Sequence, residues 1–287
     1  DRTTTGPGAR LLAQRLASPL TSPAAIDDRL DGVSFFTERE ALAERCAAVL
    51  RRTPDMARAL SRLTLGRGGP RDLAAIRDGL GGARDIARTL NESREGAPAE
   101  IAEARRALDA AQGGGFSDLI GELKAALAAE LPLMARDGGF IAKDFDPGLD
   151  AARLLRDESR RVIAGLEAQY RQQADLKTLK IRHNNVLGYY VETPPSGSDR
   201  LMSGELARLF IHRQTIASAV RFTTTELADL DARIARAGEE ALARETEIFA
   251  RLVEAVARRS GDIAAAADAL AAIDVALALG KLAREED

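Results

Sequence analysis

Two long segments with helical apolar spacing bracket a short insert that has a different pattern. The first segment runs from about Pro147 to Gln173 and the second from Thr223 to Val256. At 1.5 Å per residue they predict amphipathic helices of about 40 and 50 Å. Their apolar stripes comprise Leu155, Val162, Leu166 and Tyr170 in the first, and Leu227, Leu230, Ile234, Ala241, Phe249, Leu252 and Val256 in the second. Because each stripe must be covered, we expect an antiparallel helix pair.

The insert, residues 176–222, carries the signature of strands. Apolar and polar side chains alternate in Leu179–Arg182 and again in Tyr189–Glu192. This period of two predicts two half-buried strands. We expect His183-Asn184-Asn185 to form the turn, since Asn tolerates a positive φ angle. The insert should therefore be a small α+β element at the tip of the helix pair.

The rest of the chain is predicted to be helical. Only 4% of residues are aromatic and no Trp is present, which favours close-packed helices with Ala- and Leu-rich cores. Thr223, Thr224 and Thr225 before Glu226 resemble a capping box at the start of the return helix. Loops are expected near Pro54, at 66–70, at 113–115 and at 138–139, with a short extended passage at 140–150. Further helices are expected at 9–20, 24–36, 38–52, 71–90, 97–111 and 116–129.

The predicted fold is therefore mainly α, a helical bundle with two long antiparallel helices and a small α+β insertion. We assign residues 1–150 and 225–287 to the helical body, and residues 151–224 to the far part of the first long helix plus the insertion. The insertion proper spans about 176–222.

Charge is distributed unevenly between these parts. Residues 175–222 hold seven Lys or Arg and four Asp or Glu, which leaves a net charge of −6 on the remainder of a chain whose total is −3. A basic tip on an acidic body suits contact with a phosphate backbone. A solvated sheet edge protected by Lys and Arg would look the same, so charge alone leaves both interpretations open.

Several classes of site are not expected. Cys46 is the single cysteine, and the two histidines, His183 and His212, lack the further ligands of a zinc site. Gly280-Lys281 is followed by Leu282, so the Ser or Thr of a phosphate-binding loop is missing. We therefore expect a non-catalytic chain without a cofactor or metal.

The sequence also bears on the cellular compartment and on whether the chain is part of a longer protein. The most apolar window, Asp262–Gly280, contains Asp268 and Asp274 besides Asp262, so a membrane span is not expected. A lone cysteine and no signal peptide favour a reducing compartment, and we expect the cytoplasm. The opening DRTTTGPGARLL has no Met and suggests a piece of a longer protein.

Four stretches carry a resemblance to a known family. They are DRTTTGPGARLLAQRLASPL at 1–20, LKTLKIRHNNVLGYYVET at 176–193, HRQTIASAVRFTTTEL at 212–227 and ALAAIDVALALGKLA at 269–283. In this order they resemble the central part of the MutS family of DNA mismatch-recognition proteins, its lever and clamp domains. The second and third resemble the clamp, through Leu179, Lys180, Asn184, Gly188, Tyr189, Tyr190, Arg213, Gln214, Thr215, Ala219, Arg221, Thr224, Glu226 and Leu227.

The resemblance implies a helical lever with a clamp that grips duplex DNA through its phosphates without reading sequence. It also implies that mismatch reading and the ATPase, with ATP and magnesium, belong to regions of a homodimeric protein outside this chain. Ala217, Ser218, Val220 and Thr225 depart from the family pattern. Phe36-Thr37-Glu38 matches the Phe-x-Glu pattern of mismatch reading, but it lies at the end of a predicted helix, so we do not expect it to read mismatches.

The candidate phosphate contacts have competing explanations. Lys180 and Arg182 share a strand face and could bridge phosphates or pair with Glu192. The segment 213–215 is expected to open a helix, whose amides suit phosphate, and Arg221 could instead anchor the return helix. Packing is favoured over base stacking for the two tyrosines, and turn formation comes first for the two asparagines. The full set of DNA-backbone candidates is Lys177, Lys180, Arg182, Asn184, Asn185, His212, Arg213, Gln214, Thr215 and Arg221.

Two other functions compete with a mismatch-repair clamp. One is a MutS-like paralogue acting in recombination. The other is a helical protein-interaction scaffold without DNA contact.

Overall fold

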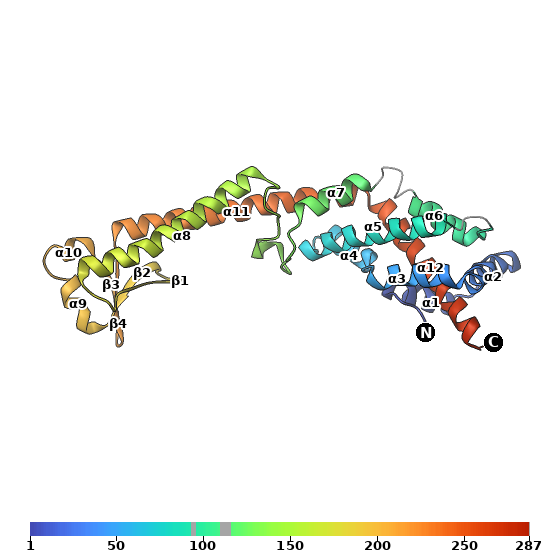
Figure 1. Cartoon of the computed structure of the whole chain (residues 1–287), viewed down its shortest axis with the longest axis horizontal. Coiled ribbons are helices and arrows are strands. Elements are labelled where there is room, and N and C mark those ends of the chain that lie inside the picture. Colours follow the sequence, from blue (N-terminus) through green and yellow to red (C-terminus); the bar gives the residue numbers. More distant parts are fainter. Residues whose placement is uncertain (93–95, 110–115, 287) are drawn as a thin grey trace. The chain divides into compact units, whose positions relative to one another are not determined.

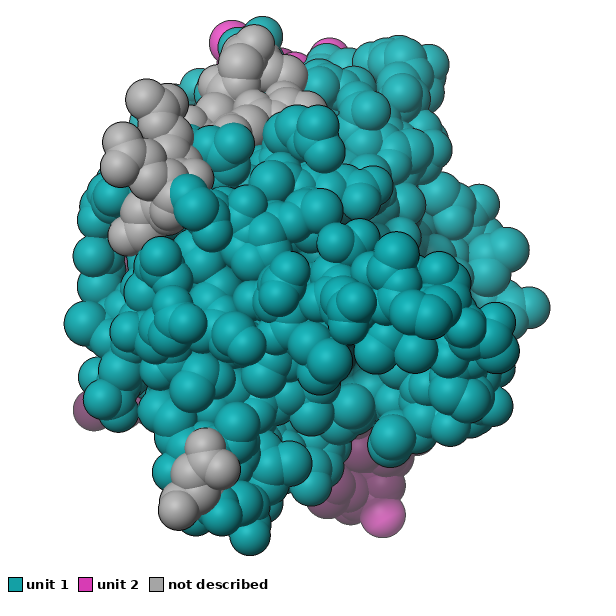
Figure 2. Space-filling view, turned by 90° about the vertical axis from the view of Figure 1, so that its right-hand side faces the viewer, with its two compact units in different colours: residues 1–145, 246–287 teal, residues 146–245 magenta. Residues whose placement is uncertain are grey.

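The computed structural model describes residues 1–92, 96–109 and 116–286. It divides into two compact units, coloured separately in Figure 2. Unit 1 comprises Asp1–Phe145 and Thr246–Asp287, and unit 2 comprises Asp146–Glu245. Residues 225–245 are predicted to belong to the helical body. The structure places them in unit 2, where they pair with the first long helix. The expected loop at 113–115 lies outside the described residues.

Unit 1 is built from helices (Figure 1). The three short helices predicted before Pro54 are confirmed, as is the break at 66–70. After the helix that ends at Ala126, Leu127 and Ile141 form an isolated antiparallel bridge, which confirms an extended passage near Phe140. The helices are α1 (Gly6–Ala17), α2 (Pro23–Glu38), α3 (Glu40–Arg52), α4 (Met56–Thr64), α5 (Pro70–Asn91), α6 (Ala99–Asp109), α7 (Ser117–Ala126), the 3-10 helix η1 (Ala135–Asp137) and α12 (Ser260–Glu286).

Helix α12 forms the core of unit 1. It packs against α1 to α6, and most of its alanines and larger apolar residues are buried, around most of its circumference. By length and composition it could cross a membrane, but 72% of its most apolar window is buried inside the protein. Phe36 on α2 is also fully buried, so the aromatic ring of the Phe-Thr-Glu motif belongs to this core.

Unit 2 contains the predicted helix pair. Its elements are α8 (Pro147–Ala174), β1 (Lys180–Asn184), β2 (Gly188–Thr193), α9 (Pro195–Leu201), α10 (Leu206–Leu209), β3 (Ile211–Ile216), β4 (Ala219–Thr223) and the first part of α11 (Thr225–Arg258). Tyr170 Oη lies 2.7 Å from Thr224 Oγ1, and Arg153 Nη2 lies 2.6 Å from a Glu245 carboxylate oxygen. From residue 170 back to residue 153 of α8, the contacting residue on α11 advances from 224 to 245. The pair is therefore antiparallel, as Figure 1 shows.

The ends of the pair are capped by side chains. Thr224 Oγ1 accepts a hydrogen bond of 3.0 Å from the Leu227 amide, which confirms a threonine cap at the start of α11. Asp146 caps α8 in the same way through the Leu149 amide, at 2.7 Å.

One part of the predicted stripe on α8 is wrong. Leu155 is 40% exposed and Val162 49%, whereas Ser159, Ile163 and Leu166 are buried. With about 3.6 residues per turn, Leu155 and Val162 fall on the flank of the buried line rather than on it. Unit 2 therefore leaves part of an apolar pattern uncovered.

The four strands form one antiparallel sheet in the order β1-β2-β4-β3. The pairings of Val191 with Ile181 and Phe222 place an apolar row on the inner face, against the helices. The core cluster beneath this face consists of Ile163, Leu166, Tyr170, Ala174, Leu179, Val191, Leu201, Phe210, Val220, Phe222, Leu227, Leu230 and Ile234.

Two local predictions about the insertion need correction. His183 belongs to β1 rather than to the turn, and the positive φ of 66° falls on Gly188. Asn184 supports the turn with its side chain, whose Oδ1 accepts from the amides of Val186 and Leu187. Residues 213–215 lie in β3, not in a helix, because their backbone pairs with β4.

Candidate nucleic-acid interface

The outer face of the sheet, away from the core cluster, gathers charged and polar side chains. Strand register places Lys180 opposite Glu192, Glu192 opposite Arg221, and Arg221 opposite Gln214. Directly opposed residues share a sheet face, so these four form one row across all four strands. Arg182 lies in the adjacent row, on the same face.

Glu192 joins the two arginines of this face. One of its carboxylate oxygens lies 2.9 Å from Arg182 Nε and the other 3.1 Å from Arg221 Nε. The cross-strand pairing considered for Arg182 is thus present, although 53% of its side chain remains exposed. A single carboxylate cannot neutralise both guanidinium groups, so the trio keeps a net positive charge.

Arg221 is held more tightly than Arg182. It donates through Nη1 to Gln214 Oε1 at 2.9 Å, and its guanidinium lies 4.8 Å from the centre of the Tyr190 ring. These contacts lie within the sheet, so Arg221 does not anchor the return helix. Tyr190 is buried beneath it, which confirms packing for this tyrosine.

Three other basic candidates are exposed and have no ion pair within the described parts of the chain. Lys180 completes the outer row, Arg213 lies at the irregularity of β3 between His212 and Gln214, and Lys177 lies between α8 and β1. With Arg182, Arg221 and Glu192, Lys180 brings the outer face to a formal net charge of +2.

The remaining candidates occupy other surfaces. Asn184 and Asn185 are at the β1–β2 turn. His212 pairs with Phe222 and therefore belongs to the inner side of the exposed edge strand, where its Nε2 lies 2.9 Å from Thr215 Oγ1. The structure thus brings Lys180, Arg182, Gln214 and Arg221 together and keeps the other candidates apart from them.

The first hairpin is fastened to the helices by residues that the sequence did not single out. Glu167 accepts from the Ile181 amide at 2.7 Å, and Arg171 Nε donates to the Leu179 carbonyl at 2.7 Å. Asp231 on α11 accepts from the Tyr189 amide at 3.3 Å. In sequence these look like ordinary charges on helix surfaces, and only their proximity to the strands reveals the role.

The described residues hold no group of three or more His, Cys, Asp or Glu side chains arranged to bind a metal ion. The polar groups of the outer sheet face are mostly cationic donors. Their chemistry suits an anionic ligand with several oxygen atoms, such as a chain of phosphates.

Comparison with known proteins gives the family context. The model of the family described as MutS domain III matches residues 1–280. The DNA mismatch repair protein MutS of Nitrobacter winogradskyi is 52% identical over 288 residues, covering 100% of this chain and 32% of that protein. Those of Azorhizobium caulinodans and Bartonella tribocorum are 52% and 50% identical, again over 100% of this chain. The chain spans about a third of the length of these curated relatives.

Proposed function

This chain belongs to the MutS family through its domain III, and on that premise we propose that it contacts the phosphate backbone of duplex DNA during bacterial mismatch repair. The observation that carries the proposal is the outer sheet face, where Lys180, Arg182 and Arg221 lie together around the single carboxylate of Glu192. Three cations on one face can follow successive phosphates, whereas a solvated edge would not require them to converge.

The chemistry supports contact without sequence reading. Phosphate contacts position a protein on DNA but carry no base information. Arg221 has two of its three guanidinium nitrogens, Nε and Nη1, engaged within the sheet, which pre-orients the third, Nη2, for an oxygen ligand. Lys180 reaches a phosphate as a point charge, and Arg213 at the edge strand extends the positive surface.

The proposal extends to the rest of the full-length protein. ATP and magnesium would bind outside this chain, in a cytoplasmic homodimer that also carries the mismatch-reading and connector regions. Helix α11 contributes residues to both units and would couple DNA contact to those regions.

Binding by this chain alone should be weak and strongly dependent on salt. With three phosphate contacts, the logarithm of affinity should fall with the logarithm of salt concentration with a slope of about −3. Fluorescence anisotropy of a labelled duplex, titrated at several salt concentrations, measures this slope. Duplexes of different sequence, with and without a mismatch, should bind equally.

A triple variant tests the site. Lys180→Gln, Arg182→Gln and Arg221→Gln together should bring the slope close to zero, because they remove the three proposed contacts and each lost contact removes about 0.9 from it. The matched control replaces three exposed arginines of unit 1, Arg67, Arg84 and Arg106, with Gln. If both triple variants lose affinity equally, or the first loses none, the sheet is not the DNA contact and the scaffold alternative gains support.

A further inference from the structure

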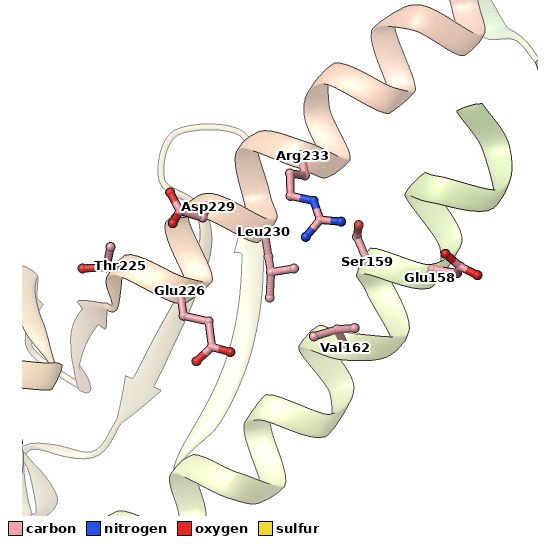
Figure 3. Close-up of a pocket in the computed structure, with 8 residues that line it drawn as sticks. All are labelled: Glu158, Ser159, Val162, Thr225, Glu226, Asp229, Leu230 and Arg233. Atoms are coloured by element: carbon pink, nitrogen blue, oxygen red, sulfur yellow. The ribbon is translucent and has the colours of Figure 1, made fainter. Parts of the chain in front are cut away.

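We infer that a groove between α8 and α11 within unit 2 binds a basic amphipathic helix of a partner protein. The groove has a volume of about 640 Å³ (Figure 3). Val162 and Leu230 supply its apolar lining, while Glu158, Glu226 and Asp229 supply carboxylates and Arg233 one cation. This surface is separate from the outer sheet face and from the DNA contact proposed above.

The apolar lining of the groove is uncovered at Val162, whereas Leu230 is buried. Val162 is 49% exposed, and Leu155, two turns earlier on the same flank of α8, is 40% exposed. Their spacing of two helical turns predicts that both are buried. In unit 2, however, α8 buries the adjacent line of side chains that contains Ser159, Ile163 and Leu166. A helix laid along α8 would cover both, because side chains at positions i, i+3 or i+4, and i+7 of one helix meet anchors two turns apart on another.

The charge of the groove indicates which kind of partner can bind there. Three carboxylates against one guanidinium leave a local formal charge of −2, and Figure 3 shows Glu226 and Asp229 on α11 and Glu158 on α8. A cationic helix is attracted to this surface, whereas nucleic acid is repelled by it. The occupant should therefore carry Lys or Arg beside its apolar stripe.

A second copy of the chain is a poorer match. In a two-fold contact the same patch faces itself, so the acidic residues of one copy would meet those of the other. Like charges across an interface are unfavourable. The geometry thus points to a different polypeptide.

The test uses a synthetic peptide as the probe. It is a fluorescein-labelled helix of about 18 residues, long enough to be partly helical in water, with leucines along one face and lysines beside them. Fluorescence anisotropy with the full chain should show saturable binding that weakens as salt is raised. A peptide with glutamates in place of the lysines should not bind, and one with the leucines scattered around the helix should bind at least tenfold more weakly.

Variants of the chain locate the binding. Leu155→Gln with Val162→Gln should weaken binding of the lysine peptide at least tenfold, and so should Glu158→Lys with Asp229→Lys. Glutamine is a good helix former, so α8 should be retained, and circular dichroism checks this. The matched charge control is Asp28→Lys with Glu103→Lys, both exposed on unit 1, which should leave binding unchanged.

Three outcomes would overturn the inference. One is peptide binding that neither groove variant alters, and another is equal binding of the scattered-leucine peptide. The third is dimerisation in sedimentation velocity that Leu155→Gln with Val162→Gln abolishes, since it would make the groove a self-contact. Duplex DNA binding should be unchanged in the apolar variant, so failure here leaves the proposed DNA contact standing.

Discussion

The two units use their charged side chains in different ways. In unit 1, Asp274 is buried and accepts hydrogen bonds of 2.6–2.9 Å from the amides of Thr4 and Thr5 and from the Thr5 hydroxyl. In unit 2, Glu192 holds Arg182 and Arg221 on an open sheet face. The carboxylate of Asp274 holds the backbone of Thr4 and Thr5 in place, whereas the carboxylate of Glu192 positions two arginine side chains on an exposed surface.

The consequence is a difference in what each region tolerates. Around Asp274 the packing leaves no spare room, because a Cβ added to Gly8 would lie 2.0 Å from Asp274 Oδ2. On the outer sheet face, Arg182 remains about half exposed. Substitutions should therefore act mainly on stability in unit 1 and mainly on binding in unit 2.

The largest effect should come from Asp274→Ala. It leaves the backbone amides of Thr4 and Thr5 and the Thr5 hydroxyl without their acceptor, so the free energy of unfolding of unit 1 should fall by about 3 kcal/mol. Asp268→Ala is the matched control, because Asp268 is exposed on the same helix and should change stability by less than about 0.5 kcal/mol.

The single cysteine allows unit 1 to be followed separately. Cys46 is buried in unit 1, and burial raises its pKa to about 12, so its thiol should react slowly at pH 8 until the unit opens. Labelling of Cys46 across a urea titration measures the effect of Asp274→Ala. Equal midpoints for the two aspartate variants would show that the contrast between the units is wrong.

A smaller effect should follow from Tyr170→Phe in unit 2. Burial raises the pKa of the Tyr170 phenol, so the hydroxyl remains protonated beside Thr224 Oγ1. Losing this buried hydrogen bond should cost about 1 kcal/mol. Hydrogen exchange in residues 146–245 measures the loss, with Tyr189→Phe, a half-buried tyrosine of the same unit, as control. An equal loss in both variants would rule out a specific role for the contact with Thr224.

The smallest effect on stability should come from Arg182→Ala. A half-exposed ion pair contributes little, so the unfolding free energy should change by no more than about 0.5 kcal/mol. Duplex DNA affinity at low salt should nevertheless fall, because one phosphate contact is lost. A stability loss near that of Asp274→Ala, or DNA affinity equal to that of the unaltered chain, would contradict the division between structural and surface charge.

Much of the fold could be predicted from local patterns. The two long helices and the strand pair are marked by apolar spacings within short windows, and the cap of the second long helix by its threonines, all of which the sequence alone contains. Residues 211–216 escaped prediction because β3 is an edge strand with almost every side chain exposed, so no apolar alternation marks it. The stripe on α8 was misplaced because Leu155 and Val162 are as apolar as the residues that α8 buries.

The candidate site was predictable only in part. Residue type and charge identified the cations of the insertion, but strand register decided which of them share a face. The separation of His212 and Thr215 from the outer row depends on the irregularity of β3 near Arg213. The supporting roles of Glu167, Arg171 and Asp231 depend on which strand edge each helix approaches.

By itself, the amino-acid sequence determined the order of elements, the helical character, the basic insertion and the family resemblance, because these reside in the spacing and chemistry of neighbouring residues. The tertiary structure alone decided that Asp274 binds backbone 270 residues away at Thr4, that Glu192 serves two arginines, and that Val162 stays uncovered. The first joins residues that are distant along the chain, the second depends on strand register, and the third depends on which face of α8 the packing buries, so only the packing of complete helices and strands settles them.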